Sequence, residues 1–487
     1  MKLVTLGDIN KEIKGYGFKY SIKDFSKQLA LIFIGVIGAG LYFSLKIPFI
    51  AFCTVFMFIL IPYVYRAQFR FIYEGKRFDD AVLYMTQMIS SFKKNKKILL
   101  SLKETREVVD DEIGIYIDEA IAYLEEGDSN GNIYLEALSI IEERYGCSRM
   151  KSLHEFLAKI ETGGGEYENA LNVLNEDIDE WSGRTYLYQK DRKNISSKIT
   201  LAIGLTFIIC AVSKYMNPEK FDFTGNIIYQ VMTTFAISAM CLFYTIIQST
   251  IIGDWLGNKS EYTERKIDKD YRIVESFNIK AARVKYFPVC LVLIALAIFY
   301  AFKGNTSISI ASVAGAYILY TQPSRKVKLA KKRLEKEILK VFPDWLRNLS
   351  ISMQTKTVRV AIKDSLPDAP YILKGYIEDM LEKFDSGDYS ITPYVEFIPD
   401  FSLKEVSSAM RALYSFNKAS KEEAEQQINL LIKRNNEMLA KAEVLRNEDV
   451  TSLCGFMVMM PMVIGCLKMV VDMVLMFGTF MTQMSTF

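Results

Sequence analysis

Few side chains in this sequence have the types and spacings that catalysis requires. The single histidine, His154, lies in a helical pattern with no second ligand or catalytic partner at a recognisable spacing. Six of the seven cysteines fall in apolar runs, and no C-x-x-C pair suggests a metal or redox site. No phosphate-binding G-x-x-x-x-G-K-[ST] loop, G-x-S-x-G or H-E-x-x-H motif occurs. We therefore expect no enzymatic activity, no metal and no cofactor.

Three consecutive glycines interrupt a helical pattern in the stretch ETGGGEYENAL, at Gly163, Gly164 and Gly165. Glycine costs roughly 1 kcal/mol inside a helix, so the run predicts either a phosphate-binding nest or a corner between two helices. No strand pattern precedes it and no Lys or Ser/Thr follows in place, which favours the corner. We expect Gly163 to end the first helix with a positive φ. Glu161 and Glu166 flank the corner and are candidates for docking a partner.

A later segment predicts a corner of the same kind. Ser420-Lys-Glu-Glu423 is a capping box, in which Ser420 and Glu423 start a helix. The helix after it, about 421–450, is charged on most sides and runs directly into an apolar tract. The equivalent segment in the first half is 166–198. We interpret both as levers that join a polar bundle to a membrane helix.

Lys468 and Asp472 interrupt the last apolar tract, 453–482, four residues apart. Charged residues inside a membrane helix are costly and usually functional or paired. The two residues therefore predict either an ion pair within the membrane or the turn of a short hairpin. The first alternative gives the chain seven spans and the second gives it eight.

The composition and the apolar tracts predict a polytopic membrane protein. Half of the residues are hydrophobic, yet 24% are charged, which fits membrane helices combined with aqueous domains. A span needs about 20 apolar residues, and the candidates are 29–45, 47–64, 199–216, 226–252, 286–302, 307–320 and 453–482. Lys and Arg gather in the leader and at the starts of the polar regions, and few occur in the tight connections. The positive-inside rule then places the N-terminus and the polar regions in the cytoplasm.

The predicted fold is all-α, with two cytoplasmic helical bundles in tandem. The expected order is a leader at 1–28, a hairpin at 29–64, a bundle at 65–198, a hairpin at 199–252, a linker at 253–285, a hairpin at 286–320, a second bundle at 321–452 and the C-terminal span or spans at 453–487. The two bundles share sequence patterns. YIDEAIAYLEEGD at 116–128 matches YIEDMLEKFDSGD at 376–388, and Phe78 and Asp80 match Phe342 and Asp344. We interpret this as an internal duplication.

This layout resembles the type II secretion F-type inner-membrane platform proteins, especially the branch that serves Tad and related type IV-like pili. The resemblance rests on RFDDAVLYMTQMISSFKKNKKILLSLKE and on LAKIETGGGEYENALNVL, and the chain looks like a fusion of two such units. It departs from the family at Lys93-Lys94-Asn95-Lys96, where Ala-Gly is usual, and the second copy lacks the glycine corner.

The resemblance implies a scaffold without enzymatic activity in the inner (cytoplasmic) membrane. A cytoplasmic assembly ATPase would dock on the bundles, and its motion would help move pilin subunits from the lipid bilayer into a filament. The sequence leaves monomer and homodimer open. The net charge of +3 gives no argument for nucleic acid. The alternative function is a permease subunit of an ATPase-driven exporter.

Overall fold

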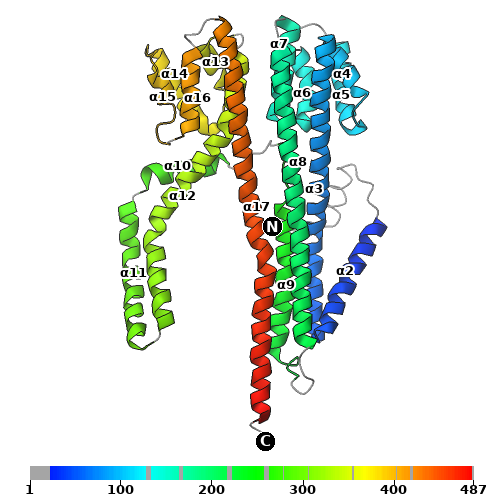
Figure 1. Cartoon of the computed structure of the whole chain (residues 1–487), viewed down its shortest axis with the longest axis vertical. Helices are drawn as coiled ribbons and strands as arrows, with labels where there is room; N and C mark the ends of the chain where they lie inside the picture. Colours follow the sequence, from blue (N-terminus) through cyan, green and yellow to red (C-terminus); the bar gives the residue numbers. More distant parts are fainter. Residues whose placement is uncertain are drawn as a thin grey trace. The chain divides into compact units, whose positions relative to one another are not determined.

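The computed structural model describes most of the chain, and the described residues form helices joined by turns, with no strand among them (Figure 1). The described residues are 22–127, 133–163, 168–215, 222–256, 263–277, 279–304, 306–353, 356–401, 403–416 and 421–484. The prediction of an all-helical chain is confirmed for these residues.

The chain divides into two compact units. Unit 1 comprises Met1–Met150, Asn175–Gly257 and Leu445–Phe487, and unit 2 comprises Lys151–Leu174 and Asn258–Val444. Three helices therefore contribute residues to both units: α7 (Ser148–Gly163), α8 (Glu168–Tyr215) and α17 (Lys421–Met484).

Unit 1 is organised around α3, which runs unbroken from Ile47 to Asn95. Its other helices are α2 (Ile22–Tyr42), α4 (Ile98–Arg106), α5 (Asp111–Glu126), α6 (Ile133–Tyr145) and α9 (Ile227–Thr250), together with most of α8 and the C-terminal part of α17. Pro48 in the first turn of α3 has no amide hydrogen to leave unpaired, and Lys96 ends the helix in the left-handed conformation. Along the second half of α3, Phe78, Met85 and Phe92 recur every seven residues and are fully buried.

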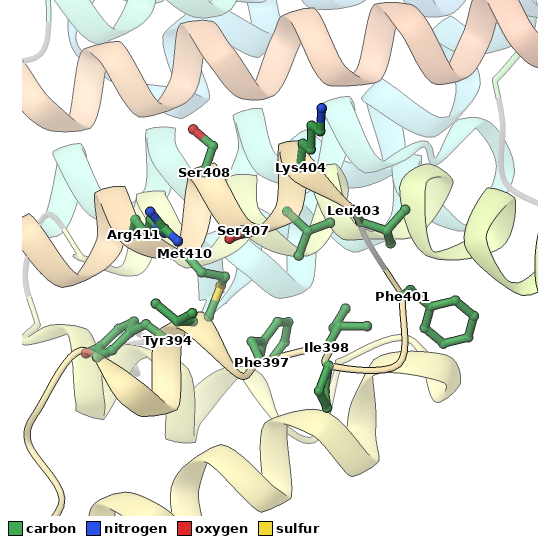
Figure 2. Close-up of a pocket in the computed structure, with 13 residues that line it drawn as sticks. Tyr394, Phe397, Ile398, Phe401, Leu403, Lys404, Ser407, Ser408, Met410 and Arg411 are labelled. Carbon is green, nitrogen blue, oxygen red and sulfur yellow. The ribbon is translucent and has the colours of Figure 1, made fainter. Parts of the chain in front are cut away.

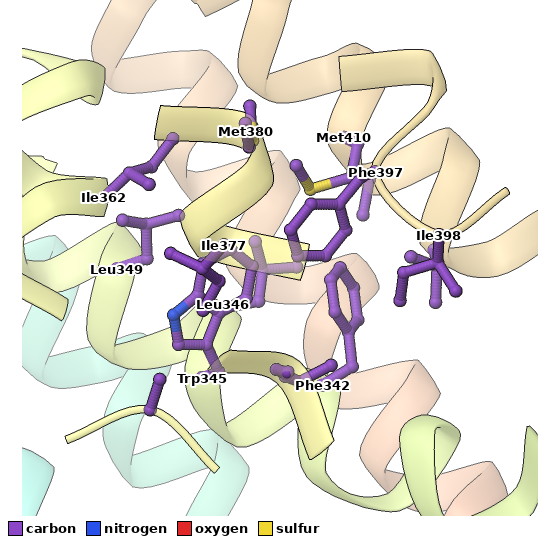
Figure 3. Close-up of a cluster of buried hydrophobic side chains, with 14 of the residues drawn as sticks. Phe342, Trp345, Leu346, Leu349, Ile362, Ile377, Met380, Phe397, Ile398 and Met410 are labelled. Atoms are coloured by element: carbon purple, nitrogen blue, oxygen red, sulfur yellow. The ribbon is translucent and has the colours of Figure 1, made fainter. Parts of the chain in front are cut away.

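Unit 2 packs its short helices against the long helix α12 (Thr306–Met353). The other elements are α10 (Glu264–Ser276), α11 (Ile279–Phe302), α13 (Val358–Ser365), α14 (Tyr371–Asp385), α15 (Thr392–Val395) and α16 (Lys404–Phe416). α11 and α12 form a hairpin whose turn contains Gly304 at φ 76°. Figure 3 shows the core, in which Phe342, Trp345 and Phe397 pack together, with the rings of Trp345 and Phe397 stacked at 5.5 Å.

Among the described residues, four helices are long and apolar enough to cross a membrane. They are Ile47–Asn95, Leu174–Tyr215, Ile227–Thr250 and Glu437–Thr482. Two predicted spans coincide with shorter apolar helices, Ile32–Tyr42 and Tyr286–Phe302, and the predicted span 307–320 is the first part of α12. The structure thus fits a helical membrane protein. α17 continues without a break through 468–472, so the alternative of a hairpin at these residues is wrong.

Candidate functional site: the polar contacts of helix α17

One narrow face of α17 is buried within unit 1. Its members include Asn447, Cys454, Pro461 and Lys468, which recur every seven residues. Such a spacing keeps residues on one side of a helix, as in coiled coils. The other faces carry large exposed apolar side chains, which suits contact with lipid. Three contact points on this face join α17 to other described parts of unit 1: two are polar, and one is a close approach at a glycine.

The first contact point joins α17 to α8 and to the segment after α9. Arg192 of α8 is only 4% exposed. Its Nε donates to Oδ1 of Asn447 at 3.4 Å, and its Nη1 donates to the carbonyl oxygen of Ile251 at 3.3 Å. The guanidinium also lies 4.8 Å from the centre of the Trp255 ring, a cation–π arrangement. We call this group the Arg192 junction. Because a guanidinium offers donors in a fixed plane, it sets the angles among three segments at once.

An apolar cluster continues from the Arg192 junction along the same helices. It contains Ile195 and Ile199 of α8, Ile247 and Ile251 from α9 and the residue after it, and Cys454 of α17. These side chains are buried. The contact of α17 with α8 and α9 therefore combines apolar packing with the polar contacts of the Arg192 junction.

The second contact point is a close approach of the α17 backbone at Gly465 to the Thr206 side chain of α8. A Cβ placed on Gly465 of α17 would lie 2.4 Å from Cγ2 of Thr206 on α8 and 3.8 Å from Sγ of Cys210. Real side chains do not tolerate the first distance, so glycine is needed here. Small residues that let membrane helices approach closely are a common means of association, since lipid removes the hydrophobic driving force.

The third contact point is the ion pair that the sequence predicted as one alternative. Nζ of Lys468 donates to Oδ2 of Asp472, and the two residues are 1% and 4% exposed. The Lys468 ammonium also lies 5.3 Å from the ring centre of Phe43 and 5.0 Å from that of Tyr229. The second Asp472 oxygen, Oδ1, has no hydrogen-bond partner among the described residues. We call this group the Lys468 cage.

Hydrogen bonds hold the turn between α2 and α3 in place beside the Lys468 cage. The hydroxyl of Tyr229 donates to the carbonyl oxygen of Phe43 at 3.0 Å. The Gln230 amide donates to the carbonyl oxygen of Ser44 at 2.9 Å and accepts from the backbone N–H of Lys46 at 2.8 Å. The start of α9 and the α2–α3 turn are thus one polar surface, and Lys468 attaches α17 to it.

These groups can position helices, but their chemistry does not suggest catalysis. Among the described ranges, no group of three or more His, Cys, Asp or Glu side chains could hold a metal ion. The arrangement is that of three attachment points, at Asn447, Gly465 and Lys468, spread along one helix.

A separate buried carboxyl lies in the polar part of α3. Burial raises the pKa of Asp80 to about 6, and the nearby Lys76 ammonium opposes this effect. Oδ2 of Asp80 accepts a hydrogen bond from the hydroxyl of Tyr145 at 3.4 Å. Its sequence match Asp344 is half-buried, and its Oδ1 lies 4.0 Å from Nη1 of Arg347. The two positions therefore have different environments.

The predicted glycine corner falls mostly outside the described residues. Helix α7 ends at Gly163 and α8 begins at Glu168, while Gly164, Gly165, Glu166 and Ser420 lie outside the described range. Gly163 is still helical and its φ is not positive, so the prediction that it ends the helix in that conformation is wrong. Glu161 is half-buried on α7, and Glu423 belongs to α17 but its side chain is not described.

The Arg192 junction and the aromatic members of the Lys468 cage were not predicted from the sequence. The sequence did carry a signal for Asn447, a member of the Arg192 junction. Asn447 lies three heptads before Lys468 and therefore shares its face of the helix. Nothing local marks Arg192, because its partner Asn447 is 255 residues away along the chain.

In comparisons with protein-family models, curated proteins and solved structures, nothing matches this chain.

Proposed function

We propose that this protein is the inner-membrane platform of a filament-assembly machine of the Tad, type IV pilus or type II secretion kind. It docks a soluble assembly ATPase on the cytoplasmic side and transmits the motion of that ATPase to helices that contact pilin subunits in the bilayer. The observation that carries the proposal is α17. This single 64-residue helix contributes its first part to unit 2 and its apolar part to unit 1.

The order of helices supports two copies of one module. α3 and α12 each begin in an apolar segment and end against short helices, as Phe78 and Phe342 in their buried faces illustrate. α8 and α17 each begin in a polar segment and end in an apolar one. The predicted duplication would give this order, and it would place both bundles on the same side of the membrane.

The contacts of α17 supply a mechanical route for the proposed coupling. At 1.5 Å per residue, a helix of this length extends about 96 Å. The Arg192 junction, Gly465 and the Lys468 cage attach its apolar part to α8, to α9 and to the α2–α3 turn. A displacement of the bundle end of α17 would therefore be passed to those helices together, since packed interfaces shift between discrete arrangements rather than deform continuously.

Insertions near Lys433 test whether α17 must be a continuous lever. Two inserted glycines would weaken the helix by roughly 2 kcal/mol and rotate the part beyond them by about 200°. We expect filament assembly to be lost while membrane abundance stays normal. A seven-residue helix-forming insertion is the matched control, because it returns the buried face to nearly its original direction. The lever model fails if the two-glycine variant still assembles filaments.

Co-purification tests the partner. The full chain, extracted in mild detergent from cells that assemble filaments, should retain a secretion-type ATPase. Absence of such an ATPase under conditions that keep the chain folded would contradict the platform function.

One observation favours the alternative of a permease subunit. A buried charge pair in an apolar helix, with Oδ1 of Asp472 lacking a described partner, is a feature that also marks ion or substrate pathways. Substrate flux into vesicles that contain the purified chain, lost in Asp472→Asn, would support transport. Filament assembly without flux would support the platform.

A further inference from the structure

Unit 2 carries a groove on the side of α16. The cavity has a volume of about 490 Å³ and lies between α15, the segment that follows it, and α16 (Figure 2). Its lining includes Tyr394, Phe397, Ile398, Leu403, Met410 and the α16 residues named below. This size is within the range of ligand and peptide-anchor pockets. All of the lining residues belong to unit 2.

The floor of the groove is apolar. Phe397, Ile398 and Met410 are buried and belong to the hydrophobic core of the unit, so the floor is fixed by packing. Val395, at the rim, is 39% exposed, and Pro399 is exposed as well. An apolar side chain that entered the groove would therefore replace water on surface that is already shaped.

One edge of the groove is basic. Lys404, Ser408 and Arg411 follow one another at i, i+4 and i+7 on α16 and are exposed, so they form a stripe about 10 Å long. In Figure 2, Lys404 and Ser408 project from the outer side of α16, whereas Met410 projects toward Phe397 and Ile398; Arg411 lies about two turns along the helix from Lys404. We call this surface the α16 groove.

The two cations of the stripe are not neutralised by the part of unit 2 that the structure describes. Neither Lys404 nor Arg411 has an ion-pair partner among the described residues, whereas nearby basic side chains do. Lys383, for example, pairs with Glu396 at 2.8 Å. Two cations that have no described ion-pair partner, at the edge of an apolar groove, call for a ligand that carries acids beside an apolar anchor.

We propose that the α16 groove docks an acidic, amphipathic segment of a soluble partner protein. In a helix laid along the groove, large apolar residues on one face would enter the cavity, and acids one or two turns to either side would lie near Lys404 and Arg411. The proposal deepens the proposed function and rests on it only for the identity of the partner as an assembly ATPase.

Site-specific crosslinking in cells tests the inference on the full chain. A photo-reactive amino acid replaces Ser408, and the crosslinked peptides are identified by mass spectrometry. We expect a peptide of a soluble protein that has acids flanking an apolar residue. Lys404→Glu with Arg411→Glu should lower its yield about tenfold, because each reversal turns attraction into repulsion across a partly exposed pair. Acid-to-lysine changes in the captured peptide should restore the yield.

Lys332→Glu with Lys363→Glu is the matched control, since both residues are exposed on unit 2 outside the groove and the charge change is the same. This variant should leave the yield unchanged. The inference is overturned if adducts come only from lipid or from this chain itself, such as residues 417–436, or if the charge changes have no effect. An acidic partner that is not an ATPase would support the groove and contradict the proposed function. An ATPase that co-purifies without crosslinking here would do the reverse.

Discussion

Replacement of Lys468 by methionine separates two contributions within the Lys468 cage: the contact with the aromatic rings and the ion pair with Asp472. The methionine side chain fills a similar volume and retains a favourable sulfur contact with the rings of Phe43 and Tyr229. It leaves the Asp472 carboxylate, which is 4% exposed, without its ion-pair partner. Breaking a buried pair on one side costs about 3–5 kcal/mol, and the sulfur contact offsets a small part of this. We expect the attachment of α17 to weaken by about 3 kcal/mol.

Thiol labelling can measure that weakening locally. Cys210 of α8 is 2% exposed, and its Sγ lies 3.8 Å from the position of a Cβ on Gly465, so it faces α17. In a chain that keeps Cys210 as its only cysteine, reconstituted in lipid nanodiscs, maleimide reacts only when α17 moves away. A loss of about 3 kcal/mol corresponds to a labelling rate roughly 100-fold higher, provided that opening precedes reaction.

The double variant Lys468→Met with Asp472→Leu decides whether the effect comes from the unpaired charge. Replacing both members of a buried pair by apolar residues is often neutral or stabilising. We expect its labelling rate to return to within about tenfold of the parent chain. The reasoning is refuted if the single variant labels no faster than the parent, or if the double variant labels as fast as the single one.

Three further predictions follow from the structure. Gly465→Leu should accelerate labelling of Cys210, because even its Cβ meets α8; Gly455→Leu, on the same helix with nothing within 4 Å, should have no effect. Gly163→Ala should be tolerated in filament assembly and should raise thermal stability slightly, since the helical Gly163 has open space at its Cβ; a loss of assembly would show that this residue needs glycine. Asp80 has a folded-state pKa raised to about 6, so the protein should lose up to about 2 kcal/mol of stability as pH rises from 4 to 7. Asp80→Asn should remove that loss in thermal unfolding between these pH values, and an equal pH dependence in both proteins would contradict the assignment.

The predictions that succeeded depend on patterns within about 20 residues. The tracts 47–64, 199–216, 226–252 and 453–482 each overlap a helix that is long and apolar enough to cross a membrane. Continuous apolar composition over that length has few other structural outcomes. The positive φ of Gly163 was predicted wrongly because a glycine run does not say which member leaves the helix.

The two alternatives for Lys468 and Asp472 illustrate the limit of local reasoning. A spacing of four residues suits an ion pair on one helix, but charged residues also occur at turns, so the sequence alone left both open. The continuous helix α17 decides for the pair. The two rings against Lys468 come from residues more than 200 positions away, and no property of the last apolar tract predicts them.

The sequence by itself determined that this protein is helical and apolar enough for a membrane, because hydrophobic period and length act locally along the chain. It also placed two charged residues, Lys468 and Asp472, in the last apolar tract. Only the tertiary structure decided what those charges and the lever helix contact: Arg192 with Asn447, Gly465 with Thr206, and Lys468 with Phe43 and Tyr229. Helix packing brings such residues together through shape and side-chain volume summed over several helices, and that information is not contained in any single segment.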